Sequence, residues 1–552
     1  MTIYVTDKYY QKAIFDLLQA GIDFSKEVSI AEKFNFAKND VGDLDIKEIF
    51  QAFAVLYAKL QKQLATHTDQ LAVDLLTNLY PEVSNIIPAT TIIQLRSKIA
   101  HVTIPNHTLC SVFNRDNKLC QFQTTQSITL TPIEILDTTC ETFNSQIHLI
   151  LKVTGLKKIE TAFHDIYINS ELTNALNLYS SIMSYDPTKD TPILYSSSYD
   201  TLNNSTPIGT VMHNTMHTYL YDKNPLHLLH EYKVFPEKFL FLRFKISKET
   251  ISENDGFLLI PINHQNAILH KNLFLPNCVP IVNLFEKKSE PFKFDQTQQM
   301  YKVRPDMNEE AYEIYKIKKI FSYSHEQQRM VEWSNYFDIT SDSDFFWKEI
   351  TKPHSHYVGQ TTFVSFIHNH KENNLPLQNK IISATCLCSN RQQATKINID
   401  QSFAFKNEKN VTAKNILNIR PPIYTKQATM YWQLINNLGF NYLNLACEHN
   451  DVKYIRNFMR IYEQIDTTVK IPIDSLTDFT IKKKMTVINK NEWKGAIPLL
   501  EIALYFTTTE YILILAEILA NIISKSVHFY SQVKCNIYIN NKLVKIYTNN
   551  VF

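Results

Sequence analysis

The stretch of sequence that decides the fold is LAVDLLTNLYPEVSNIIPATTIIQ, residues 71–94. Its first part carries leucines at helical spacing, and Tyr80-Pro81 ends that helix because proline cannot continue the hydrogen-bond ladder. After Pro88 the residues become β-branched, a composition typical of a strand. We therefore predict a helical region up to about residue 85 and a β-rich region after it.

Two further helices are predicted before this stretch. Apolar residues recur at helical intervals over 9–24, and again over 45–64, where Asp45 and Glu48 resemble a capping box. The second helix carries an apolar stripe, made of Ile46, Ile49, Phe50, Phe53, Leu56, Tyr57, Leu60 and Leu64. We expect this stripe either to form the core of its own domain or to pack against another subunit.

The remainder of the chain predicts an α+β protein of several domains. At 552 residues the chain exceeds the roughly 250–300 residues at which single cores stop growing. Alternation near the C-terminus predicts a closing hairpin around Asn540-Asn541. We expect strands at 90–95, 100–104, 119–124, 127–135, 239–246 and 256–262, and helices at 69–79, 171–183, 430–445 and 509–524. The predicted regions are 1–85 helical, 86–300 β-rich or α+β, 301–420 mixed, and 421–552 mixed α/β after an extended linker at Arg420-Pro421-Pro422.

Composition excludes several classes of function. The charge of +2 provides no global field that would attract nucleic acid or anionic lipid. Eight cysteines are too few for a disulfide scaffold, and eight widely spaced glycines exclude a glycine-rich phosphate loop. The N-terminus has no secretory signal, and the most apolar stretch, 511–523, is shorter than the ~20 residues that cross a bilayer. We expect a cytoplasmic protein with a buried helix at 511–523.

Candidate chemical sites are weak. His213 and His217 lie one helical turn apart. We expect Cys386 and Cys388 on opposite faces of a strand. Neither pair forms part of a set of four ligands, which structural zinc normally requires. A loose histidine group, His354, His356, His368 and His370, is expected in a solvated loop or in a core. Lys482-Lys483-Lys484 is expected on a solvated surface. No nucleophile elbow is present.

The 71–94 stretch also resembles the signature of the TssF family (VasA, ImpG), in which a helix ends in Leu-Tyr-Pro and a second proline precedes the first strand. Similar segments follow in the family's order and cover nearly the whole chain. They include EYKVFPEKFLF at 231–241, PIVNLF at 280–285, CSNR at 388–391 and NIRPP at 418–422. The scarcity of glycine and the many Asn, Ile and Lys residues resemble a divergent, IglH-like branch.

This resemblance implies a structural subunit of a type VI secretion baseplate wedge, with no catalytic residue, metal or cofactor. It implies two copies of the chain per TssG-like subunit, contacts with TssE-like and TssK-like proteins around a VgrG-like spike, and a cytoplasmic place near the inner membrane. Nucleic acid binding and membrane insertion are not expected. The residues expected to be structural or interfacial are Tyr80, Pro81, Pro88, Phe235, Pro236, Glu237, Lys238, Phe239, Asn283, Leu284, Phe285, Asn390, Arg391, Arg420 and Pro421.

Two alternatives stay open on the residues alone. One is a hydrolase-type enzyme built on the β-rich middle region, which would need a deep pocket where polar groups with perturbed pKa values converge. The other is a ligand-binding or glycan-binding module, which would need exposed aromatic side chains along a groove. Within 235–241 we expect the Glu237-Lys238 turn to place two phenylalanines in the core.

Overall fold

The computed structural model describes most of the chain from residue 86 to residue 549. The gaps in this range are 98, 100, 144, 160, 187, 213–225, 248–250, 252, 264–267, 296, 325–328, 339–344, 355, 369–379, 407, 409, 425–431, 433–451, 464–471, 491–492, 508–511 and 527–531. Before residue 86 it describes 9–17, 19–20, 23, 49, 51–64 and 71. The chain divides into two units, one of residues 1–84 with 427–435 and one of the remaining residues, 85–426 with 436–552.

In the first unit the described residues are helical. Helix 51–64 packs on helix 9–17 through two small residues, Ala54 and Ala58, which are buried with Ala13. Alanine on the inner face allows the two backbones to approach closely. The predicted helix at 69–79 lies outside the described residues apart from residue 71, which is helical. Tyr80-Pro81, predicted to end that helix, and the predicted capping residues Asp45 and Glu48 also lie outside them.

The second unit contains a closed barrel of six strands. Its strands are β1 (Thr90–Ser97), β14 (Cys278–Val282), β4 (Leu119–Thr124), β3 (Leu109–Phe113), β23 (Ser402–Phe405) and β24 (Val411–Asn415), in that spatial order. β1 closes the barrel by pairing antiparallel with both β14 and β24. The barrel therefore joins segments separated by about 300 residues of sequence, and the apolar residues along its strands form one core.

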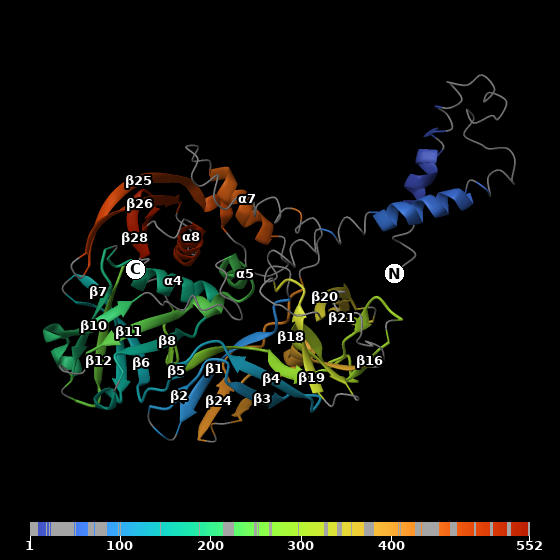
Figure 1. The fold of residues 1–552 in the computed structure, drawn as a ribbon. Helices are drawn as coiled ribbons and strands as arrows, with labels where there is room; N and C mark the ends of the chain where they lie inside the picture. The colour runs from blue at the N-terminus through green and yellow to red at the C-terminus, as the bar shows by residue number, and fades with distance from the viewer. Residues whose placement is uncertain are drawn as a thin grey trace. The chain divides into compact units, whose positions relative to one another are not determined.

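The first eight-stranded sheet runs β13 (Phe274–Pro276), β8 (Phe163–Ile168), β11 (Phe241–Ile246), β10 (Thr206–Met212), β9 (Thr191–Ser196), β12 (Gly256–Ile262), β7 (Gln146–Thr154) and β6 (Glu134–Phe143). The helices α4 (Leu172–Met183) and α5 (Leu226–Val234) lie beside this sheet (Figure 1). The predicted strand 256–262 and the helix near 171–183 are both present. The strand predicted from residue 239 starts at Phe241, because η4 (Pro236–Phe239) is a 3₁₀ helix.

The second eight-stranded sheet runs β15 (Phe285–Lys288), β22 (Lys380–Ser389), β18 (Glu313–Ser324), β19 (Arg329–Asn335), β20 (Phe345–Pro353), β21 (Gln360–His368) and β17 (Tyr301–Lys302), and β16 (Phe292–Phe294) also pairs with β22. Aromatic rings fill its core, where Trp333 lies 4.8 Å from Phe366 and 6.0 Å from Phe294, ring centre to ring centre. A pair of short strands, β2 (Thr103–Ile104) and β5 (Ile128–Thr129), stands apart. The remaining 3₁₀ helices are η2 (Leu156–Lys158), η3 (Tyr199–Asn204), η6 (Arg391–Lys396) and η7 (Ile473–Ser475).

The C-terminal sheet has the order β25 (Leu476–Lys490), β26 (Trp493–Phe506), β27 (Gln532–Ile539) and β28 (Lys542–Asn549). Its long first hairpin curves around α8 (Ile512–Ser526), with α7 (Val452–Glu463) nearby (Figure 1). Residues 512–520 are all buried, which confirms the buried helix expected there. The closing hairpin is also confirmed, since Asn540 (φ 49°) and Asn541 (φ 62°) form a two-residue turn with both backbones left-handed.

These features agree with the predicted fold class at the coarse level, a β-rich α+β chain with some helices. The segment Arg420-Pro421-Pro422, where an extended linker is expected, lies between two isolated antiparallel bridges, one from Arg420 to Thr90 and one from Ile423 to Ile87. The helix predicted at 430–445 lies outside the described residues except for 432. None of the described helices is long and apolar enough to cross a membrane.

Candidate functional site

Two of the sequence motifs lie side by side where the chain passes between the barrel and the second eight-stranded sheet. Asn283-Leu284 connects barrel strand β14 to sheet strand β15. Asn390-Arg391 follows sheet strand β22 and leads, through η6, back to barrel strand β23. The motifs are 107 residues apart in sequence, yet both form the connections between the same two sheets.

The two asparagines bond to each other directly. The Asn390 backbone N–H donates to Asn283 Oδ1 (2.7 Å), and Asn283 Nδ2 donates to Asn390 Oδ1 (2.9 Å) and to the Gln121 carbonyl (2.7 Å). The Gln121 N–H also donates to Asn390 Oδ1 (3.0 Å), which ties strand β4 into the network. Asn283 is 0% exposed and Asn390 2% exposed. A buried amide pair with these partners is a neutral polar link between barrel and sheet.

Arg391 extends this link into the sheet. Its guanidinium donates to three carbonyl oxygens, from Nε to Tyr312 (2.9 Å), from Nη1 to Val358 (3.1 Å) and from Nη2 to Gln360 (3.1 Å). The Glu313 carboxylate lies 3.7 Å from Nη1, and both side chains are buried. Because a buried charge is costly without a partner, the carbonyls and the carboxylate together hold the cation.

Backbone geometry around Arg391 is unusual. Its φ of 50° lies in the left-handed region, which is uncommon for a residue with a Cβ. Gly359 has a φ of 133°, and a Cβ there would lie 2.4 Å from Arg391 Nη1 and 2.5 Å from Glu313 Oε1. The Tyr424 hydroxyl donates to the other Glu313 oxygen (3.0 Å). Glycine at 359 is therefore required for the guanidinium and carboxylate to approach.

A small hollow of about 20 Å³ adjoins this network. Its lining includes Lys302, Arg304, Glu309 and His354, with His354 Nε2 3.3 Å from a Glu309 oxygen. This volume holds about one water molecule, whereas small-molecule sites are typically hundreds of Å³. The hollow does not fit a substrate, and it lends no support to the hydrolase alternative.

The EYKVFPEKF segment supplies a second set of buried charges. Helix α5 stops before Pro236, and η4 turns the chain so that Phe235 (0% exposed) and Phe239 (7% exposed) enter the core, as expected. The two charged residues between them, Glu237 and Lys238, also form ion pairs, and the predicted turn did not include these pairs. Lys238 donates to Glu231 on α5, and Glu237 accepts from Arg420.

The Glu231–Lys238 pair is almost fully buried, with side-chain exposures of 0% and 1%. Burial lowers the pKa of Lys238, and the Glu231 carboxylate partly offsets that effect. Lys238 Nζ also lies 5.6 Å from the centre of the Phe239 ring. Breaking either partner would leave an uncompensated charge in the core, so this pair fixes α5 against η4.

The remaining predicted residues are placed as follows. Pro88, Leu284 and Phe285 are buried, while Pro421 is exposed and Pro236 is the first residue of η4. Tyr80, Pro81, His213, His217 and His370 lie outside the described residues. Sequence reasoning did not select Gln121, Glu313 or Gly359 as site residues. Gln121 contributes backbone atoms only, so no sequence signal marks it.

Cys386 and Cys388 do not lie on opposite faces, so that expectation is wrong. Both are 0% exposed and belong to the same core of the second eight-stranded sheet, because side chains alternate along a strand and residues two apart share a face. Burial raises the pKa of both thiols, that of Cys388 to about 12. Within the described part of the chain no group of three or more metal-ligating side chains occurs. Lys482, Lys483 and Lys484 are exposed, as expected.

Comparison with known proteins identifies relatives over the whole length. The model of the family described as "Type VI secretion system, TssF" matches residues 5–548. The type VI secretion system component TssF1 of Pseudomonas aeruginosa strain PAO1 is 19% identical over 544 residues, covering 86% of each chain. A chain of a TssK-TssF-TssG baseplate subcomplex, solved by cryo-electron microscopy, aligns with a TM-score of 0.70 at 15% identity over 92% of this chain and 98% of that one. A chain of a type VI secretion baseplate complex aligns at 0.60 and 14% identity over 99% of both.

Proposed function

Because the chain belongs to the TssF family of type VI secretion systems and is a structural baseplate subunit rather than an enzyme, we propose that it assembles there with TssG-like and TssK-like subunits. One structurally similar chain belongs to a complex named for TssK, TssF and TssG. The proposal extends to two copies of this chain per TssG-like subunit, to TssE-like and VgrG-like neighbours, and to a cytoplasmic place near the inner membrane. Residues 1–85 would be a helical assembly region.

The observation that carries this proposal is the outer face of helix 51–64. Phe53, Leu56, Leu60 and Leu64 are 63%, 62%, 55% and 60% exposed, and Ile49 in the turn before them is 56% exposed. Its inner face uses alanines. More than half of the surface of each of these large apolar residues is therefore left uncovered by the described part of the first unit. Contiguous exposed apolar residues mark a protein interface.

The buried polar links of the second unit support a scaffold in a different way. The Asn283–Asn390 pair and the Arg391 contacts connect barrel and sheet through hydrogen bonds that require one geometry. Such links resist relative movement of the two sheets. A subunit that transmits load between partners needs this rigidity, whereas an enzyme would need a substrate cavity.

The test is co-purification of the full chain with its TssG-like neighbour, followed by mass measurement. We expect a 2:1 complex, and a double substitution, Leu56→Glu with Leu60→Glu, is expected to abolish it by placing two carboxylates in an apolar interface. Lys59→Glu is the matched control, because it makes the same change of two charge units at an exposed residue of the same helix that is not part of the apolar stripe. A complex that survives the double substitution, or a wild-type chain that does not bind, would contradict the proposal.

A further inference from the structure

The second eight-stranded sheet has a face that its own core does not use. Along β22 the buried residues that belong to the aromatic core are Ile382, Ala384, Cys386 and Cys388. The alternate residues point to the opposite side of the sheet, here called the outer face, and they are Ile381, Ser383, Thr385 and Leu387. Where one face of an antiparallel sheet packs on the core, the other face is normally polar and solvated. At the end of β22 that carries Ile381, the outer face departs from this rule.

Apolar residues form a row across three neighbouring strands of the outer face. Ile381 of β22 lies opposite Tyr323 of β18, and Tyr323 lies opposite Met330 of β19. These three residues, here called the apolar row, are 38%, 36% and 61% exposed in that order. The next residue of β18 on this face, Phe321, is half-buried and adds apolar surface beside the row. Exposed apolar residues that adjoin one another mark a binding surface, whereas single ones are ordinary.

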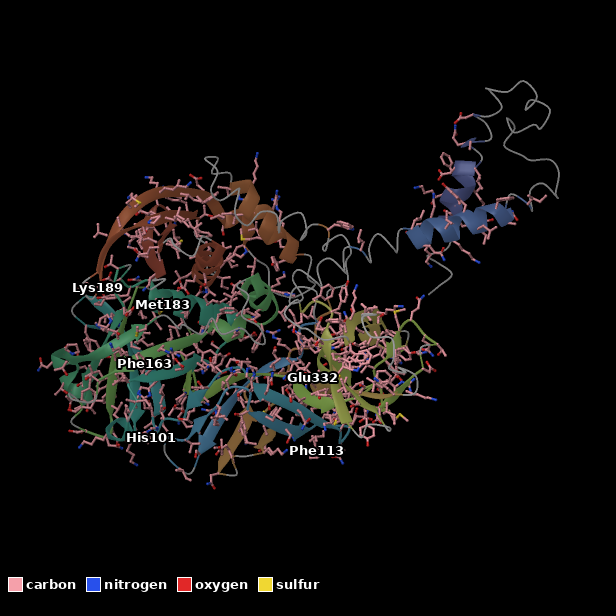
Figure 2. The ribbon with its side chains drawn as sticks, in the orientation of Figure 1. His101, Phe113, Phe163, Met183, Lys189 and Glu332 are labelled. Atoms are coloured by element: carbon pink, nitrogen blue, oxygen red, sulfur yellow. The ribbon has the colours of Figure 1, made fainter. Side chains whose placement is uncertain are left out.

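Lysines border the apolar row. Lys293 of β16 lies opposite Ile381 and continues the row to the next strand, and Lys288 of β15 lies on the same face opposite Thr385. Both lysines are exposed, and neither forms an ion pair or a hydrogen bond with a described residue. Two other lysines of this face are paired with glutamates, as Lys318–Glu286 and Lys319–Glu332, of which Glu332 is labelled in Figure 2. Because Lys288 and Lys293 have no such partner, the surroundings of the row are positively charged.

The spacing of the row fits a helix that lies across the strands. Neighbouring strands are about 4.8 Å apart, so the step from Lys293 to Met330 over four strands covers roughly 14 Å. On one face of an α-helix, residues three or four positions apart are about 4.5–6 Å apart along the axis. A helix laid across the strands can therefore place one apolar residue against each member of the row. An added strand does not fit here, because β22 and β18 are each paired on both sides and offer no free edge.

We propose that the outer face binds an acidic amphipathic helix of a partner subunit, with the helix's apolar stripe on the row and its carboxylates beside Lys293 and Lys288. This adds a second contact surface to the assembly function proposed above and rests on that function. The charges disfavour a second copy of this chain, because two outer faces would bring like charges together and no described helical segment carries a net charge below −1. They also disfavour an anionic membrane or a nucleic acid, since Glu286 and Glu332 lie among the lysines.

Binding of the full chain to the purified TssG-like and TssK-like subunits, each titrated separately, tests the charges. The variant carries Lys288→Glu and Lys293→Glu. We expect its affinity for one of the two subunits to fall at least about tenfold, because the two new carboxylates would face those of the helix. Lys157→Glu with Lys158→Glu, on the exposed η2 turn, makes the same change in charge elsewhere and should leave both affinities unchanged. Rising salt should weaken the wild-type binding and reduce the difference between the variants.

A second substitution tests the apolar row and leaves the lysines in place. Met330→Glu should lower the affinity for the same subunit at least about tenfold, because it would bury a carboxylate against the apolar stripe of the helix. Met307→Glu is the matched control, since Met307 is 77% exposed and lies outside the row, in the segment before β18. More than half of each methionine is exposed, so both variants are expected to fold.

A photo-crosslinker in place of Met330 identifies the partner segment in the complex of the full chain with both subunits. We expect it to mark a segment with apolar residues at helical spacing and a net negative charge. The inference is overturned by a crosslink to a second copy of this chain or to a basic segment, by binding to phosphatidylglycerol vesicles that the lysine variant loses, or by variants that bind both subunits as tightly as the wild type. The last result leaves the proposed function intact, whereas a wild-type chain that binds neither subunit contradicts both.

Discussion

Helix 51–64 and strand β22 distribute their side chains in opposite ways. The helix places alanines inside and leaves its leucines and Phe53 exposed, whereas β22 buries Ile382, Cys386 and Cys388 completely. The first pattern gains little stability from the chain's own folding, and the second supplies a core. We infer that the first unit serves assembly and the second supplies the stable body, and the following substitutions test that division.

The largest loss of stability is expected at the buried ion pair. Lys238→Ala leaves the Glu231 carboxylate without its cation, and we expect the free energy of unfolding to fall by about 3–5 kcal/mol. Chemical denaturation of the purified chain measures this. The double variant Glu231→Leu with Lys238→Met removes both charges and should be close to neutral. A single variant as stable as the wild type would show that the pair does not hold α5 to η4.

The asparagine link between barrel and sheet is expected to give the next effect. Asn283→Ala removes the acceptor of the Asn390 N–H and the donor to the Gln121 carbonyl, which are buried, at an expected cost of about 2–3 kcal/mol. The same denaturation experiment applies, with Asn203→Ala on an exposed turn as the control. Equal stabilities of the two variants would contradict a linking role.

The second unit should also lose stability in acid through His164, which follows Phe163 on β8 (Figure 2). Burial lowers the pKa of His164 to about 4, below its ordinary value of 6.5. A folded-state pKa that is depressed contributes stability above pH 6.5, and this stability is lost as the pH falls toward 4. Between pH 7 and pH 5 we expect a loss of roughly 2 kcal/mol from this group.

Unfolding measured at both pH values checks this expectation. His164→Leu should reduce the difference between pH 7 and pH 5, whereas Asn203→Ala, at an exposed residue that does not titrate, should leave it unchanged. An unaltered pH dependence in His164→Leu would assign the acid sensitivity to other groups.

The smallest effect is expected on the outer face of helix 51–64. Leu60→Glu should change the unfolding free energy by no more than about 0.5 kcal/mol, because more than half of the leucine is already exposed to water. Ala58→Leu, on the inner face of the same helix, should cost about 1–3 kcal/mol through overpacking against helix 9–17. Thermal unfolding of both variants decides the point. The reverse order would mean that the leucine stripe is the core of the first unit.

Local sequence patterns correctly predicted those helices, strands and turns that depend mainly on neighbouring residues. The Asn540-Asn541 turn follows from the tolerance of asparagine for left-handed backbone, and the buried α8 follows from an apolar residue at nearly every position. Strand 119–124 and strand 256–262 were predicted with the bounds that β4 and β12 have. The Glu237-Lys238 turn was predicted in part, since its phenylalanines are buried, but its ionic partners were not.

The sequence alone determined the change from helical to β-type residues at Pro88, the periodicity of each element and the order of motifs that indicates the family, because each depends on neighbouring residues or on residue identity. Only the tertiary structure decided which residues meet. Asn283 and Asn390 come together because two distant connections cross between the same sheets, and Arg391 needs the missing Cβ of Gly359. The sequence of helix 51–64 does not show whether its leucine stripe is buried or exposed. In the structure the alanines of this helix, and not the leucines, pack against helix 9–17. Which face of a helix is buried depends on how it pairs with a second helix, so one helix sequence alone does not determine it.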